Sequence, residues 1–346
     1  MLSDVAADPR EPGVTDPSVP ASETAAASTP LTQASELPPV AAAEAPALDV
    51  AMGSVGSGEA CWLSVKSPIK SGPNEDAVAA IPLETGRGLL LVADGLGGHR
   101  GGRRASQLIR KSLTRMATRL KAPAPPGNSI IISQAIEIPC PVEPAPPADH
   151  RSAILNEIER VNHRLIRGRV GAATTLALVE IHDGRVRSYH IGDTEILIVS
   201  QRGRIKYATV SHSPVGYGVQ SGLLTEEEAL AHPERHVVSN VIGSPLMSVE
   251  IGAWIDLSAR DTVLLASDGL FDNLLQQEIV EMIRKGPLDQ GVHNLAQLAR
   301  ERMQIPQVDQ PSKPDDLTIL AYRETNRKPT RKSPRKKVAE KPGGTP

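Results

Sequence analysis

Five short acidic motifs recur along this chain of 346 residues, and each carboxylate stands at or beside the end of an apolar run. The motifs are PNEDA (73–77), LLLVADGLGGH (89–99), YHIGDTEILIV (189–199), LLASDGLFDNL (264–274) and PDDLTIL (314–320). Such apolar runs are typical of buried strands, and an Asp-Gly pair after one is typical of the turn that ends it. Strand ends that gather several carboxylates need hard cations to neutralise them, so the motifs predict a metal centre.

Taken one at a time, the motifs have simpler explanations. A single Asp-Gly after a strand is usually only a turn, and a single Asn-Glu-Asp is usually a solvated loop or a helix cap. Five such motifs in one order are much harder to explain by chance.

In this order the motifs resemble those of the metal-dependent protein serine/threonine phosphatases, the type 2C family, in its bacterial form. The resemblance extends from about Trp62 to Tyr322. Its most specific stretches are VADGLGGHRGGRRAS (92–106), GAATTLALV (171–179) and LLASDGLFD (264–272). It implies an enzyme that hydrolyses phosphoserine and phosphothreonine on proteins.

The resemblance also implies the site residues. Asp94 would bridge two metal ions, and Asp94 and Asp268 would be central to catalysis. The implied metal ligands are Glu75, Asp76, Asp94, the Gly95 carbonyl, Asp193, Asp268, Asp272 and Asp315. Two ions of Mn²⁺ or Mg²⁺, which both prefer oxygen ligands, would activate water, and Asp193 and Asp272 would hold a third, weaker ion. The alternative for Asp272 is a cap of the helix that follows it.

The chain departs from the family pattern at several positions. Many members carry an Arg that holds the substrate phosphate where this chain has Ser71, and Lys70 is the nearest replacement. Thr194 replaces a Ser but keeps the hydroxyl, and Asp316 replaces an Asn. The stretch 211–229 begins with Ser in place of Asp and is expected to form a flap beside the site.

Histidine leaves two readings open. The unperturbed pKa of a histidine side chain would suit His99 to the role of general acid, but the resemblance to the bacterial pattern implies that this residue is part of a glycine-rich scaffold. His190, His212 and His236 are interpreted as core or loop residues rather than ligands.

Composition divides the chain into one folded domain and irregular segments. Residues 1–58 hold eight prolines, thirteen alanines and eight acidic residues against one basic residue, and we expect them to be disordered. Residues 324–346 form a basic tail, which we also expect to be disordered. The phosphatase domain then spans 59–323, with a Pro-rich insertion at 121–150.

Hydrophobic periodicity predicts the fold class. Apolar residues at helical spacing indicate helices at 105–120, 154–165, 278–285 and 295–303. Between them lie strand-like runs at 173–181, 185–191, 194–200 and 204–210, with hairpin turns at 182–185 and 201–204. This predicts an α+β fold with antiparallel sheets. The family resemblance implies two stacked sheets flanked by helices, an α-β-β-α sandwich.

The remaining expectations concern partners and location. No apolar run approaches the roughly 20 residues that span a bilayer, the start has no secretory pattern, and two cysteines give no disulfide framework, so we expect a cytoplasmic monomer. The basic tail has no aromatic residues for base stacking, which disfavours specific nucleic-acid binding. Phosphorylated proteins, a Ser/Thr kinase among them, are the implied partners. A pseudophosphatase that only binds such a partner, and a regulator with one dedicated substrate, are the alternatives.

Overall fold

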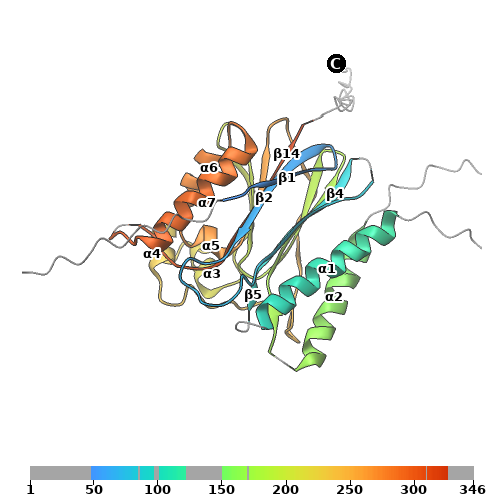
Figure 1. The fold of residues 1–346 in the computed structure, drawn as a ribbon, viewed down its shortest axis with the longest axis horizontal. Coiled ribbons are helices and arrows are strands. Elements are labelled where there is room, and N and C mark those ends of the chain that lie inside the picture. Colours follow the sequence, from blue (N-terminus) through green and yellow to red (C-terminus); the bar gives the residue numbers. More distant parts are fainter. Residues whose placement is uncertain are drawn as a thin grey trace, which may run out of the picture. The chain divides into compact units, whose positions relative to one another are not determined.

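The computed structural model describes residues 48–84, 86–96, 101–121, 150–169, 171–308 and 310–325, all within one compact unit, Ala47–Pro346. His99, residues 1–47, most of the Pro-rich insertion and most of the basic tail lie outside these ranges, so the expectations for them stay predictions. Two large β-sheets make up the centre of the unit (Figure 1).

The first sheet joins strands from both ends of the described chain. Its strands, in spatial order, are β1 (Ala51–Val55), β2 (Gly58–Val65), β14 (Leu317–Glu324), β13 (Thr262–Ala266), β9 (Glu195–Val199) and β10 (Ile205–Ala208). The last strand, β14, therefore lies in the interior of the sheet between β2 and β13.

The second sheet is built from the middle of the chain. Its strands, in spatial order, are β11 (Glu250–Ile251), β8 (Arg185–Ile191), β7 (Leu176–His182), β4 (Arg87–Ala93) and β3 (Ala77–Pro82), with β12 (Ile255–Asp256) also on β8. A separate short pair joins β5 (Gly95–Leu96) to β6 (Ala173–Thr174). All strand pairings among the described residues are antiparallel, as predicted.

Strand β4 shows why its sequence is an unbroken apolar run. Leu90 and Val92 pack into the core between the two sheets, whereas Leu89 and Leu91 pack on the opposite face against helices. Alternate side chains of a strand point to opposite faces, so a strand covered on both faces needs apolar residues at every position.

Helices cover the outer face of each sheet. On the second sheet lie α1 (Gly101–Lys121) and α2 (Arg151–Gly168); on the first lie α5 (Asp268–Phe271), α6 (Gln276–Ile283) and α7 (Leu288–Gln304) (Figure 1). The predicted α-β-β-α sandwich is confirmed. Three apolar cores, one between the sheets and one under each helix layer, hold it together.

Several local predictions need adjustment. Helix α7 begins seven residues before the predicted helix at 295–303. The stretch 211–229, expected only as a flap, contains α3 (Pro214–Gln220) and the start of α4 (Glu226–Ala231). The predicted hairpin at 182–185 is present between β7 and β8, where Asp183 and Gly184 adopt positive φ angles of 49° and 77°.

The boundary expected at residue 59 is too late. Strand β1 pairs with β2 along its whole length, and Val55 is 1% exposed in the core between the sheets. The other four β1 side chains are at least partly exposed, so the strand has almost no apolar pattern in the sequence. Backbone pairing with β2 at the edge of the sheet, rather than burial of side chains, therefore fixes the position of β1.

Two truncations test this boundary. Removal of residues 1–55 should lower the melting temperature by several degrees, because burial of a valine such as Val55 contributes about 2 kcal/mol. Removal of residues 1–47 is the matched control and should leave the melting temperature unchanged. Equal melting temperatures for the two truncated proteins would show that β1 does not stabilise the sandwich.

Candidate metal centre

Strand ends of the second sheet carry three of the predicted site residues. Glu75 and Asp76 directly precede β3, and Asp94 directly follows β4. Because β3 and β4 are antiparallel neighbours, with Ala77 opposite Ala93, the start of one strand and the end of the other lie at the same edge.

The first sheet brings its own carboxylates to the same place. Asp193 precedes β9, Asp268 follows β13 after Ser267, and Asp315 lies two residues before β14. Asp94 is surrounded by the negative charges of Asp76, Asp268, Asp193 and Asp315. The two sheets therefore converge on one acidic cluster, as the five motifs predicted.

Four of these carboxylates each have one buried oxygen that accepts no hydrogen bond. Among the residues that the structure describes, the buried side-chain oxygens without a hydrogen bond include Glu75 Oε1, Asp76 Oδ1, Asp193 Oδ1 and Asp268 Oδ1. A buried anionic oxygen without a donor is strongly unfavourable unless a cation neutralises it. The donor set consists of oxygen atoms alone, which fits Mg²⁺ or Mn²⁺.

Burial and mutual repulsion shift the pKa values of the cluster upward. Burial, and then Asp76 and the other carboxylates, hold the pKa of Asp94 well above its usual range. The same causes raise the pKa of Asp76 to about 7 and that of Asp193 to about 8. The pKa of Asp315 rises to about 6 through burial and Asp268. Several of these groups therefore retain protons near neutral pH when no cation is bound.

Asp316, where the family pattern has Asn, holds the loop that carries Glu75. Its carboxylate is 2% exposed and accepts 2.8 Å hydrogen bonds from two backbone N–H groups, those of Ser67 and Glu75. An Asn side chain offers one acceptor oxygen, so only a carboxylate can hold both N–H groups with separate oxygens. The departure from the family pattern thus has a structural role in positioning a site residue.

A serine links the two sheets directly at the cluster. Ser267, which precedes Asp268, donates a 2.8 Å hydrogen bond from Oγ to Asp76 Oδ2. This bond fixes one oxygen of Asp76 and leaves Oδ1 facing the cluster.

Threonines fix the backbone around Asp94. The Asp94 N–H donates to Thr175 Oγ1 at 3.1 Å, and the Asp94 carbonyl accepts from Thr174 Oγ1 at 2.6 Å. The Thr194 hydroxyl bonds to that of Thr175, so the Thr that replaces Ser in the third motif uses its hydroxyl to support Asp94.

Glycine is required where the chain turns beside Asp94. A Cβ on Gly95 would lie 2.3 Å from the backbone of Gly102 and 2.7 Å from the Glu75 carbonyl oxygen. A Cβ on Gly102 would lie 2.8 Å from Glu75 Oε1. These separations are too short for any side chain, so the start of α1 can approach Glu75 only with glycine at both positions.

Two lysines lie at the acidic cluster. Lys70 forms an ion pair with Asp315, and its side chain is 45% exposed. Lys313 binds Asp268 and Asp272 and is 17% exposed.

The alternative role of Asp272 as a helix cap is wrong, because α6 has Leu275 at its N-cap position and Asp272 instead follows α5.

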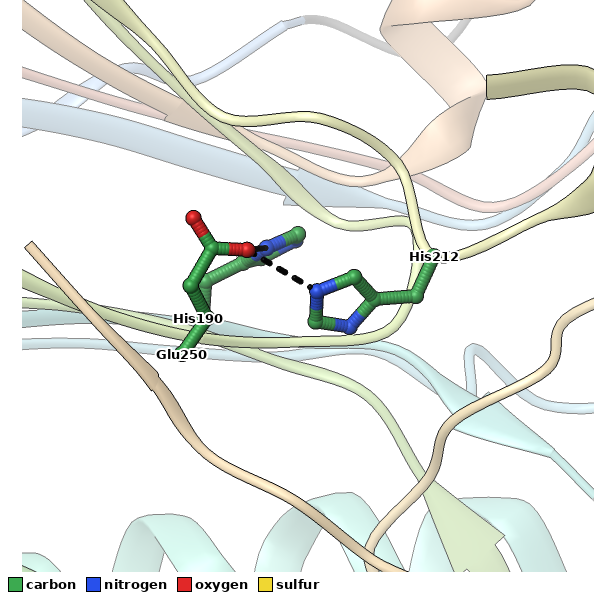
Figure 2. A group of neighbouring side chains, drawn as sticks. All are labelled: His190, His212 and Glu250. Carbon is green, nitrogen blue, oxygen red and sulfur yellow. Dashed lines mark hydrogen bonds and ion pairs between the residues drawn. The ribbon is translucent and has the colours of Figure 1, made fainter. Parts of the chain in front are cut away.

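A histidine pair lies beside the segment that carries Asp193. In the described part of the chain, His190, His212 and Glu250 are the one group of three ligand-type side chains whose donor atoms lie within 4.8 Å of one another. Figure 2 shows the Glu250 carboxylate near both imidazole rings. Glu250 Oε2 is 3.1 Å from His212 Nε2.

Hydrogen bonding makes His212 a poor metal ligand. Its Nδ1 lies 3.0 Å from the backbone nitrogen of Gly192 and accepts that N–H, which leaves Nε2 to donate to Glu250. The backbone N–H of His212 also donates to the Gly192 carbonyl at 2.8 Å. His212 therefore fixes the turn before Asp193, and His190 is buried beside it.

A cavity of about 270 Å³ adjoins the acidic cluster. Its walls include Asp193, Asp268 and Asp272 together with residues of helices α3 and α4. The stretch predicted to form a flap thus lies beside the site and provides room for a substrate next to the carboxylates.

Comparison with known proteins agrees with this geometry. The sequence pattern of the family described as Protein phosphatase 2C matches residues 67–304, more than half of the chain. This chain belongs to the protein phosphatase 2C family. The resemblance stated from the motifs is confirmed, and the enzyme class is that of a protein serine/threonine phosphatase.

Relatives and solved structures are similar over most of the domain. A putative protein phosphatase 2C-type protein of Streptococcus pyogenes is 28% identical over 250 residues, which cover 69% of this chain and 92% of that protein. The structure of the S. agalactiae serine/threonine phosphatase has a TM-score of 0.60 and 26% identity and covers 78% of this chain and 100% of that one. The catalytic domain of PstP, solved with two manganese ions, has a TM-score of 0.56 and 22% identity. The match covers 80% of this chain and 99% of the PstP domain chain.

Sequence reasoning named all of the proposed carboxylate ligands and Lys70, but it missed Lys313 and the neighbouring Glu195, whose pKa is raised to about 8 by burial and by Asp272 and Asp193. Lys313 stands directly before the last acidic motif, and a basic residue at that position was the available signal. The motif itself lies beyond residue 304, where the match to the phosphatase 2C pattern ends. Asp316 was noted as a departure, but its two backbone partners lie 249 and 241 residues away and could not be inferred from the sequence.

The raised carboxyl pKa values predict how stability depends on pH. A carboxyl whose pKa is higher in the folded state stabilises the fold below its unfolded pKa, and this stability is lost as pH rises through the folded pKa. In a phosphatase stripped of metal by chelator, the melting temperature should therefore fall between about pH 4 and about pH 8, the window set by Asp76 and Asp193.

Saturating Mn²⁺ should remove this fall, because a bound cation stabilises the ionised carboxylates. The exposed variant Glu84→Gln is the control and should leave the pH profile unchanged. A melting temperature that stays level across this range in chelator would contradict the strained acidic cluster.

Proposed function

We propose that this chain hydrolyses phosphoserine and phosphothreonine on proteins with water activated by two divalent cations. The observation that carries the proposal is the set of buried carboxylate oxygens without a donor at the ends of two sheets. Membership of the protein phosphatase 2C family supports the same reaction.

The residues at the cluster fit a centre for two ions. The proposed ligands are Glu75, Asp76, Asp94, the Gly95 carbonyl, Asp193, Asp268 and Asp315. Bound Mn²⁺ or Mg²⁺ would supply a water of lowered pKa and would neutralise the phosphoryl oxygens. The two manganese ions in the PstP structure support this number for a related protein. Lys313 binds both Asp268 and Asp272, but only Asp268 keeps a buried oxygen, Oδ1, without a partner, so Asp272 is left out of this set.

The protein's own groups would orient the reaction. Asp94 stands at the centre of the cluster and is held on both sides of its peptide by Thr174 and Thr175. Lys70 is exposed enough to leave Asp315 and attract a phosphate that enters from solvent. Its ammonium is a point charge, so it would attract the phosphate without the two-point geometry of an Arg.

A pseudophosphatase is the second candidate function. It would keep the fold and lose ligands, whereas this chain retains all of the carboxylates that the family pattern requires. The two anchors that support them, Asp316 and Ser267, are also intact. We therefore favour catalysis. A dedicated substrate would be compatible with the same centre.

We further propose phosphorylated proteins as substrates, a Ser/Thr kinase among them, for a cytoplasmic monomer. Cys61 is a free, fully buried thiol whose pKa burial raises to about 11, and a free thiol suits a reducing compartment. None of the helices among the described residues is long and apolar enough to cross a membrane.

Loss of one central carboxylate tests the proposed chemistry. Asp94→Asn should reduce Mn²⁺-dependent hydrolysis of p-nitrophenyl phosphate to less than a tenth of the wild-type rate, because it removes charge from the middle of the centre. Asp268→Asn should have a similar effect. Asp183→Asn, on an exposed turn, is the control and should keep full activity. A folded Asp94→Asn protein with a tenth or more of wild-type turnover would refute the two-ion reading.

The role of Lys70 can be tested through the Michaelis constant. Lys70→Ala should raise KM for a phosphothreonine peptide with little change in the Mn²⁺ requirement, because it removes an attractive charge near the entering phosphate. Ser71→Arg should lower KM by restoring a guanidinium at the position where many family members have one. A silent Lys70→Ala together with a harmful Ser71→Arg would assign the phosphate to another cation.

A further inference from the structure

The ammonium group of Lys313 lies between two carboxylates at the outer end of the acidic cluster. Its Nζ is 2.7 Å from Asp268 Oδ2 and 2.5 Å from Asp272 Oδ2. The lysine side chain and both of its partners are largely buried, with exposed fractions of 17%, 12% and 17%. These are short, charge-assisted contacts in a site with little water.

A buried amide fixes the backbone of this lysine. Asn273, which is 0% exposed, accepts from the Lys313 N–H at 2.7 Å and donates to the Lys313 carbonyl at 2.9 Å. The same Nδ2 donates to the Gly269 carbonyl within α5 at 3.0 Å. Lys313 is thereby attached to the short helix that also carries Asp268 and ends at Asp272. The ammonium position is set by the fold rather than by a free swing of the side chain.

The two oxygens of Asp268 have different surroundings. Oδ2 binds Lys313, whereas Oδ1 is buried and has no hydrogen-bond partner among the described residues. Buried oxygens of Glu75, Asp76 and Asp193 likewise have no hydrogen-bond partner among the described residues, and Asp193 lies near Asp268, Asp272 and Lys313. Asp268 Oδ2 and Asp272 Oδ2 therefore already have a cation, whereas the unpartnered oxygens have none.

We propose that the Lys313 ammonium takes the place of a third divalent cation, so that the centre holds two metal ions and Asp272 binds lysine instead of metal. This inference rests on the metal centre of the proposed function. An ion bound to the other oxygen of Asp272, Oδ1, would lie close to the Lys313 ammonium on Oδ2, and the two positive charges would repel each other at short range in a buried site. The +1 charge offsets part of the negative charge of Asp268 and Asp272.

Lys70 differs from Lys313 in the features that matter here. It contacts a single carboxylate, that of Asp315, and its side chain is 45% exposed. No buried side chain fixes both of its backbone groups among the contacts of the described residues. Lys70 can therefore leave Asp315 when an ion or a phosphate arrives, whereas Lys313 remains between its two partners.

Metal counting tests the inference without reference to activity. We would measure bound Mn²⁺ per chain by equilibrium dialysis with elemental analysis and by electron paramagnetic resonance, at saturating Mn²⁺. The wild-type protein should bind two ions. Lys313→Met keeps the length of the side chain, removes its charge and should bind three. The double variant Lys313→Met with Asp272→Asn should return to two, because the added ion would need the Asp272 carboxylate.

Two control variants complete the design. Lys313→Arg retains a positive charge and should bind two ions, and Lys70→Met removes a lysine charge beside the same centre and should also bind two. Circular dichroism and melting temperature establish that each variant is folded. If Lys313→Met does not fold, the number of Mn²⁺ ions bound by the wild type and by Lys313→Arg tests the inference, which requires two ions in both proteins.

The inference is overturned if the wild-type protein binds three ions or if folded Lys313→Met binds only two. A wild-type protein that binds three ions and hydrolyses p-nitrophenyl phosphate would overturn this inference and leave the proposed function standing. A folded wild-type protein that binds no Mn²⁺ would overturn both.

Discussion

Repulsion between carboxylates that are held together at the ends of two sheets is the constraint on which this structure depends. Glu75, Asp76 and Asp94 come from one sheet, and Asp193, Asp268 and Asp315 come from the other or its edges. Each would gain solvation by moving apart. The apolar cores between the sheets and under the helices supply the stability that keeps them in place.

Hydrogen bonds to neutral groups position these carboxylates and the backbone that carries them, but they do not neutralise the negative charge. Asp316 uses both oxygens to hold backbone N–H groups, Ser267 holds one oxygen of Asp76, and Thr174 and Thr175 hold the Asp94 peptide. The Ser267 contact leaves the other oxygen of Asp76, Oδ1, without a partner at the cluster. Preorganisation of this kind removes the cost of gathering ligands when an ion binds. The lysines do the opposite and supply charge at the margins of the cluster.

Much of this could be read from the sequence, because the signals were local. Apolar runs that end in Asp-Gly predicted the strands and the carboxylates at their ends, and the spacing of apolar residues predicted α1 and α2. Strand β1 was missed because only Val55 of its five residues is buried, and edge pairing leaves no hydrophobic pattern. In α4, the Thr225–Glu228 capping box was a readable signal that was overlooked in a glycine-rich stretch.

The contacts of Lys313 could not be read in this way. Asn273 and Lys313 are 40 residues apart in sequence and are brought together only when β14 enters the sheet beside β13. The pairing of β14 with its other neighbour, β2, brings Asp316 to Ser67. Tertiary contacts of this range depend on the whole topology, and no local pattern encodes them.

The interior position of β14 also has a consequence for the synthesis of the protein. Its neighbours β2 and β13 are made earlier, and they can be joined only when residues 317–324 have left the ribosome. Asp315 and Asp316 arrive with that same strand. A nascent chain that has been translated through most of the domain therefore has an unfinished sheet and an incomplete ligand set. The ability to remove phosphate appears only when nearly all of the folded domain has been translated, so partial translation products are not active phosphatases.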